Sequence, residues 1–130
     1  MKAAFVIGRI LFGGFFVYSG INHFKSKQAM AGYTASKGVP APEASVLLSG
    51  LALITGGASI IFGVKPKLGA AALLGFLATA SPMMHDFWNG QDPQARQNDL
   101  VHFSKNIALL GAALALAGIE EPWPARLQLE

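Results

Sequence analysis

The sequence predicts an all-α integral membrane protein, a compact bundle of four helices that cross the bilayer up, down, up and down. Hydrophobic residues make up 52% of the chain and charged residues only 13%, whereas soluble domains carry roughly 25% charged residues. The apolar residues gather in four runs, each close to the ~20 residues that a helix needs to cross a bilayer. A length of 130 residues suits one domain, so residues 1–130 are assigned to a single membrane domain.

The four predicted spans cover residues 3–24, 44–64, 68–88 and 100–119. The second span is the cleanest, because it contains no charged residue. The first carries Arg9. We expect this side chain either to snorkel to the near membrane surface or to pair with helix carbonyls or a lipid phosphate.

The connections between the spans differ in length and composition. Residues 65–67 form a short link, which makes the second and third spans antiparallel neighbours. Residues 26–37 are predicted to form a short interfacial helix. Residues 89–99 are polar and contain Pro93, so we expect a loop there. In the tail, Trp123 is expected to anchor the chain at the membrane interface.

Small residues recur inside the predicted spans, among them Gly13, Gly20, Gly50, Gly57 and Gly75. Lipid provides no hydrophobic drive between helices, so close backbone contact at small residues stabilises such bundles. The ordinary glycine content of membrane helices accounts for about half of these positions. We predict tight packing, with Gly57 at a helix contact.

Charge and cysteine content exclude several classes of function. The formal charge is +3, but the basic residues are scattered beside the apolar runs, which is typical of lipid headgroup contacts rather than of a nucleic-acid interface. The lipid bilayer is therefore an expected partner and nucleic acid is not. Four basic residues fall on each side of the predicted membrane, so charge does not decide the orientation. The chain has no cysteine, which excludes disulfides, thiol redox chemistry and thiolate-ligated metals within it.

Alternation of the four spans places all three histidines at the same end of the bundle. The stripes that contain His23 and His102 also carry small or polar residues, which suits an inward face. Lys105 lies about one turn deeper than His102 and needs an acidic partner, and Asp86 is the nearest acid in depth. We predict that the histidines converge near Asp86 and Lys105. The candidate catalytic residues are His23, His85, Asp86, His102 and Lys105.

Asn22, Asn106 and Trp88 are candidate ligand-binding residues at the same end. One interpretation treats the whole cluster as headgroup-layer residues whose hydrogen bonds join the helices. The other treats it as a site, because ionisable groups below the interface mark one. Such a site suits a quinone head group that exchanges protons with imidazoles, or a polar vestibule for a small solute or a lipid head group. A metal site is disfavoured, because no pair such as H-x-x-x-H is present, and we assign no metal ligand.

Several segments share a family pattern in their order and spacing. They are Gly8-Arg9 and residues 15–24 in the first span, residues 38–40 before the second, residues 56–57 and 62–63 within it, residues 85–88 closing the third, and residues 102–106 opening the fourth. Together these segments resemble the DoxX family over nearly the whole chain. Many relatives carry a glutamate just before the double glycine, where this chain has Thr55.

The resemblance implies a small four-helix protein of the bacterial inner membrane, with both termini in the cytoplasm. Through its similarity to the DoxD subunit of a thiosulfate:quinone oxidoreductase, it implies a redox-associated accessory role linked to oxidative stress. A membrane quinone is then the expected cofactor, since the chain itself supplies none, and a soluble redox partner or a homo-oligomer is the expected assembly. The alternative is a non-enzymatic membrane scaffold, or a module that binds a lipid or small solute.

Overall fold

A computed structural model describes residues 2–128, and every regular element in that range is a helix. The elements are α1 (Lys2–Lys25), α2 (Lys27–Ser36), α3 (Pro42–Phe62), α4 (Pro66–Met84), the 3-10 turn η1 (Phe87–Asn89) and α5 (Pro93–Ala117). Four segments are long and apolar enough to cross a membrane, namely α1, α3, α5 and the stretch Pro66–Asn89 that contains α4 and η1. The all-α, four-span prediction is confirmed, and α2 is the short helix expected between the first two spans.

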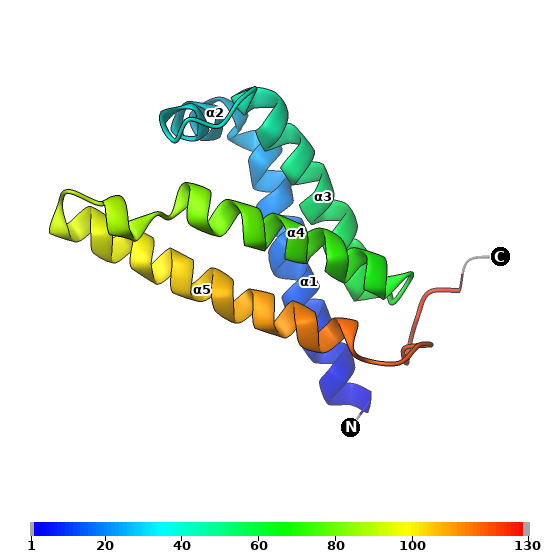
Figure 1. The fold of residues 1–130 in the computed structure, drawn as a ribbon. Helices are drawn as coiled ribbons and strands as arrows, with labels where there is room; N and C mark the ends of the chain where they lie inside the picture. The colour runs from blue at the N-terminus through cyan, green and yellow to red at the C-terminus, as the bar shows by residue number, and fades with distance from the viewer. Residues whose placement is uncertain (1, 129–130) are drawn as a thin grey trace.

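The long helices form two antiparallel pairs. α1 packs along α3, and α4 packs along α5 (Figure 1). α3 also contacts α4, which follows it after a short link. The two pairs cross at an angle and diverge toward the end that carries α2 and η1 (Figure 1). The bundle is therefore less compact at that end than at the end with the chain termini.

Glycines bring α1 and α3 into close backbone contact. A Cβ atom added at Gly20 would lie 2.6 Å from the Gly50 carbonyl oxygen, and one added at Gly57 would lie 2.6 Å from the Gly13 carbonyl oxygen. Neither atom fits without separating the helices, because ordinary contacts begin near 3.4 Å. The predicted packing role of Gly57 is thus confirmed, and this helix pair is the tightest part of the fold.

Arg9 and the C-terminal tail close the end of the bundle where the termini lie. Arg9 is only 2% exposed. Its Nε donates to the Ile61 carbonyl (3.2 Å) and its Nη2 donates to the Ala125 carbonyl (2.8 Å). Its guanidinium also lies 5.6 Å from the ring centroid of Phe5 and 5.7 Å from that of Trp123. The carbonyl partners expected for Arg9 are present, and snorkelling is not observed. Trp123 is buried in the core rather than anchored at the interface, so that prediction was wrong.

One predicted boundary was wrong. α5 begins at Pro93, seven residues before the predicted start, because Asp92 caps the helix by accepting a hydrogen bond from the Gln94 N–H (3.4 Å) and Pro93 occupies the first helical position. The polar segment expected as a loop is therefore mostly helix. α4 itself ends at Met84, shortly after Pro82 interrupts its backbone hydrogen bonding. With η1 the span continues to Asn89, one residue beyond the predicted end at residue 88.

Candidate functional site

A cleft of about 830 Å³ lies where the two helix pairs diverge. α3 and α4 provide most of its apolar wall, including Leu48, Ala52, Ala71, Ala72, Gly75 and Phe76. The absence of a side chain at Gly75 leaves part of this space open, since a Cβ atom added there would have no neighbour within 4 Å. The volume falls in the ~300–1,000 Å³ range of small-molecule sites. The cleft is thus large enough for a ligand and mostly apolar.

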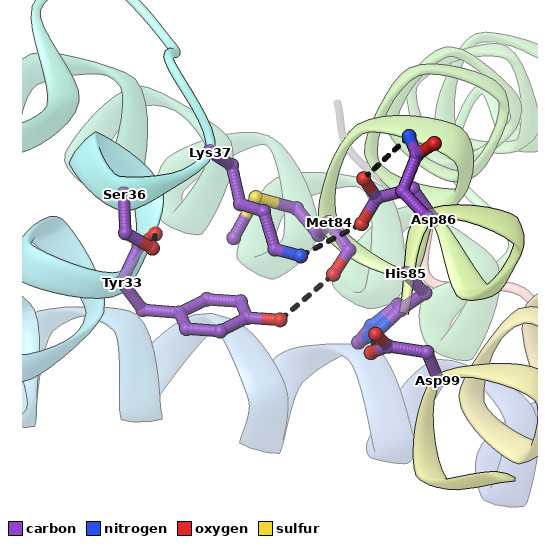
Figure 2. Close-up of polar contacts among 8 residues, drawn as sticks. Tyr33, Ser36, Lys37, Met84, His85, Asp86 and Asp99 are labelled. Carbon is purple, nitrogen blue, oxygen red and sulfur yellow. Dashed lines mark hydrogen bonds and ion pairs between the residues drawn. The ribbon is translucent and has the colours of Figure 1, made fainter. Parts of the chain in front are cut away.

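α2 covers one end of the cleft, and two contacts hold the end of this helix to the end of α4 and to the residue before η1. Met30, Tyr33 and Thr34 of α2 line the cleft. Tyr33 donates its hydroxyl hydrogen to the Met84 carbonyl (2.9 Å), as Figure 2 shows. The Lys37 ammonium lies 2.7 Å from an Asp86 carboxylate oxygen (Figure 2).

The Lys37–Asp86 ion pair changes the predicted role of Asp86. The hydrogen bond to this carboxylate raises the pKa of Lys37 above its ordinary value. The second carboxylate oxygen of Asp86 accepts a hydrogen bond from the Asn89 amide (3.2 Å). Asp86 was expected to pair with Lys105, and that was wrong. Because α2 folds back over the cleft, Lys37 reaches Asp86 and Lys105 does not.

His85 and His102 stack against each other, with ring centroids 4.9 Å apart and an interplanar angle of 21°. The His85 Nδ1 atom lies 3.3 Å from a carboxylate oxygen of Asp99, which is near it in Figure 2. His85 lines the cleft, whereas His102 is exposed beside it. At this end of the bundle the Asp99 carboxylate therefore contacts the His85 imidazole, and His85 in turn lines the cleft.

His23 lines the same cleft from α1, and its hydrogen bonds fix its tautomer. Its Nδ1 atom lies 3.2 Å from the Val46 carbonyl oxygen and 3.1 Å from the Ser49 hydroxyl oxygen. The Ser49 hydroxyl donates its one hydrogen to the Val46 carbonyl (2.9 Å), so both oxygens are acceptors toward the imidazole. Nδ1 must therefore carry the hydrogen, and Nε2 of the neutral ring carries the lone pair. His23 faces Phe76, with ring centroids 6.0 Å apart, rather than the other two histidines.

Lys105 and Asn106 line the cleft from α5. The Lys105 Nζ atom lies 5.4 Å from the ring centroid of Phe15 on α1. Asn106 is only 8% exposed, and its amide makes no hydrogen bond to any residue in the described range 2–128. The remaining two candidates lie outside the cleft lining. Asn22 is exposed and accepts a 3.4 Å hydrogen bond from Ser26, and Trp88 packs edge-on against Phe87 and Phe103.

Sequence reasoning missed three residues of the site, namely Tyr33, Lys37 and Gly75. Tyr33 lies in the last turn of α2 and Lys37 is the C-cap residue that follows it, so the sequence places both at the end of a short helix. That position does not show which part of the chain they contact. Within residues 2–128, no three histidine, aspartate or glutamate side chains come together in a geometry that could hold a metal ion.

The fold and the cleft define a four-span membrane protein with a ligand-sized apolar cleft that has a polar end. The chain belongs to the DoxX family, whose model matches residues 4–86. The match covers most of α1 and all of α2, α3 and α4, and it includes both cleft histidines, His23 and His85. No curated protein and no solved structure matches the chain.

Proposed function

We propose that this DoxX-family protein binds a membrane quinone in the cleft and serves as an accessory subunit of an oxidoreductase system. One observation carries the proposal: the apolar wall of the cleft leads to His23, His85, Lys105 and Asn106. A quinone needs both features. Its isoprenoid tail is apolar, and its ring oxygens accept hydrogen bonds in the oxidised form and donate them in the reduced form.

The histidines are suited to proton exchange with such a head group. The Nε2 atom of His23 carries a lone pair, which accepts the hydrogen of a quinol hydroxyl. An imidazole takes up and releases protons near neutral pH. His85 is backed by the Asp99 carboxylate 3.3 Å away, which orients its ring and stabilises its protonated form. We propose that Asp99 and His85 carry protons between the membrane surface and the cleft.

The electrons would come from, or pass to, a soluble redox partner or another subunit, since the chain has no cysteine for thiol redox chemistry. Membership of the DoxX family supports a place in the bacterial inner membrane with both termini in the cytoplasm. The proposal requires a quinone in the cleft and a redox partner at the membrane surface. That partner binds either a single copy of this chain or a homo-oligomer of it.

The test is to fill the cleft and measure the quinone that co-purifies. Gly75→Leu places a branched side chain in open space inside the cleft. Gly111→Leu is the matched control, because its added Cβ also meets no atom within 4 Å and Gly111 does not line the cleft. Mass spectrometry of mild-detergent preparations should find quinone with the wild type and Gly111→Leu and lose it with Gly75→Leu. Equal quinone in all three proteins, or none in any of them, would refute the proposal.

A lipid-binding module without redox function is the second candidate. The lining follows α4 from Ala71 to Met84, which is about 20 Å of helix at ~1.5 Å per residue. That length suits an acyl chain as well as an isoprenoid tail. Phospholipid or fatty acid in place of quinone, again lost with Gly75→Leu, would favour this function.

A further inference from the structure

Lys105 is an exposed cation that lines the cleft and has no acidic partner among residues 2–128. No carboxylate among residues 2–128 lies within 4.0 Å of its ammonium group, whose described contact is with the Phe15 ring. Three acids at this end of the bundle are paired elsewhere: Glu43 faces Lys27, Asp86 faces Lys37 and Asp99 faces His85. The fourth, Asp92, caps the start of α5. Lys105 is therefore not balanced by the protein around it.

The position of Lys105 makes this imbalance costly. It lies six residues beyond Asp99 on α5, which is about 9 Å further along the helix axis. Charged groups within a membrane are strongly disfavoured unless they reach the headgroups or meet a counter-charge. The contact with Phe15 directs the ammonium across to α1, along the cleft wall, and a cation–π contact offsets only part of the cost of desolvation. A counter-ion in the cleft would offset the rest.

The other polar groups of the cleft complement Lys105. The lining contains no aspartate or glutamate among the described residues, and its titratable nitrogen groups are His23, His85 and Lys105. Asn106 follows Lys105 on α5 and is more than nine-tenths buried, with an amide that has no hydrogen-bond partner within residues 2–128. The amide atoms themselves are not fully buried and reach the cleft, so the amide can donate a hydrogen bond to a ligand oxygen there.

We infer that the cleft selects amphiphiles whose head group carries negative charge on oxygen, and that Lys105 sets this preference with Asn106 as a hydrogen-bond donor. The inference rests on the proposed use of the cleft and specifies its ligand class. Two head groups share this chemistry, the carboxylate of a fatty acid and the phenolate of a singly ionised quinol. The phenolate forms when the O–H bond of the quinol breaks and His23 Nε2 takes the proton, with no transfer of electrons.

Two photoreactive probes with the same long tail, one ending in a carboxylate and one in an alcohol, test the inference. The protein is reconstituted in nanodiscs of phosphatidylcholine, irradiated, and mapped by mass spectrometry. In the wild type the acid should label cleft peptides about tenfold more than the alcohol, the ratio that one charge-assisted hydrogen bond supplies. Lys105→Met should remove this ratio by weakening only the acid, whereas Lys105→Arg should retain it. Lys25→Met, which removes a cation at the end of α1 outside the cleft lining, should leave it unchanged.

The outcomes separate the two proposals. Equal labelling by acid and alcohol in the wild type, or an unchanged ratio in Lys105→Met, overturns the charge preference while leaving an amphiphile site in place. Labelling that avoids the cleft, or that Gly75→Leu does not reduce, overturns the cleft as a binding site and the charge preference with it. Competition between the acid probe and a short-tailed quinone, added in its oxidised or its reduced form, identifies which of the two head groups the cleft binds. Displacement by the reduced form points to the quinol, and displacement only by unlabelled fatty acid points to the carboxylate.

Discussion

Gly57→Leu should destabilise the bundle by separating α1 from α3. The first added carbon already lies 2.6 Å from the Gly13 carbonyl oxygen, 2.9 Å from a Val17 methyl group and 3.0 Å from the Val17 nitrogen. Two of these three atoms belong to the backbone, so no side-chain rotation relieves the contact and the helix itself must move.

The expected magnitude follows from two opposing effects. Overpacking costs typically ~1–3 kcal/mol, and a leucine against backbone belongs at the upper end. Replacing glycine inside a helix returns about 1 kcal/mol through helix propensity. The net loss should be about 2 kcal/mol in the free energy of unfolding, measured by denaturant titration in bicelles.

Gly14→Leu is the control for this prediction. It changes the same residue type in the helix that Gly57 contacts, but its added Cβ meets no atom within 4 Å. It should leave the free energy of unfolding unchanged or raise it by up to about 1 kcal/mol. Equal free energies for Gly57→Leu and the wild type would show that α1 and α3 are not in close contact at this point.

Three further predictions concern other parts of the molecule. Cysteines introduced at Lys37 and Lys65 of this cysteine-free chain should react with a membrane-impermeant reagent from opposite sides of the membrane, and labelling of both from one side would contradict the four-span topology. Arg9→Met should release the tail that contains Trp123, because the Ala125 carbonyl loses its 2.8 Å partner, and limited proteolysis should then cut the tail faster than in the wild type. Lys37→Met should lower the unfolding temperature by an amount that depends on pH. The pKa of Lys37 is raised by its hydrogen bond to Asp86, so its stabilisation is complete below the unfolded-state pKa of about 10.4 and disappears as pH rises through the higher folded-state value. If the difference in unfolding temperature between Lys37→Met and the wild type instead grew above pH ~11, the stabilising role assigned to the Lys37 ammonium would be refuted.

The topology was predictable because it depends on local properties of the sequence. Four apolar runs of about 20 residues can each satisfy their backbone hydrogen bonds only as helices within a bilayer. The short link at residues 65–67 then fixes antiparallel order for two of them. Glycine density likewise predicted close packing, and Gly57 shows that contact directly.

The partners of the polar residues were not predictable in the same way, because they depend on how the helices cross. Depth along the helices made Asp86 the nearest acid to Lys105, but the fold-back of α2 brings Lys37 to Asp86 first. The start of α5 was missed for a local reason. Pro93 was interpreted as part of a loop, although Asp92 followed by Pro93 is a favourable helix start.

The distribution of small residues explains why the apolar cleft opens at the end of the bundle that carries α2 and η1. At Gly13, Gly20 and Gly57 the space of the absent side chain is filled first by the backbone of the facing helix, and at Gly50 it is filled by the His23 Cβ atom, so α1 and α3 are closely packed. On α4, Gly75 faces no atom within 4 Å, and it and its small neighbours Ala71 and Ala72 line the open cleft.

The polar groups follow the same division between the two ends. At the end with the chain termini, Arg9 donates from Nε to a carbonyl of α3 and from Nη2 to the Ala125 carbonyl of the tail, and it packs beside Trp123. Its Nη1 atom is buried without a hydrogen-bond partner among residues 2–128. At the open end, the Asn106 amide and the Lys105 ammonium have neither a hydrogen bond nor an ion pair within residues 2–128. A group that stabilises the fold is engaged by the fold, as Arg9 is. Groups that line a cleft and are not engaged by the fold are available to a ligand, and for this reason the function is assigned to the end that carries Lys105.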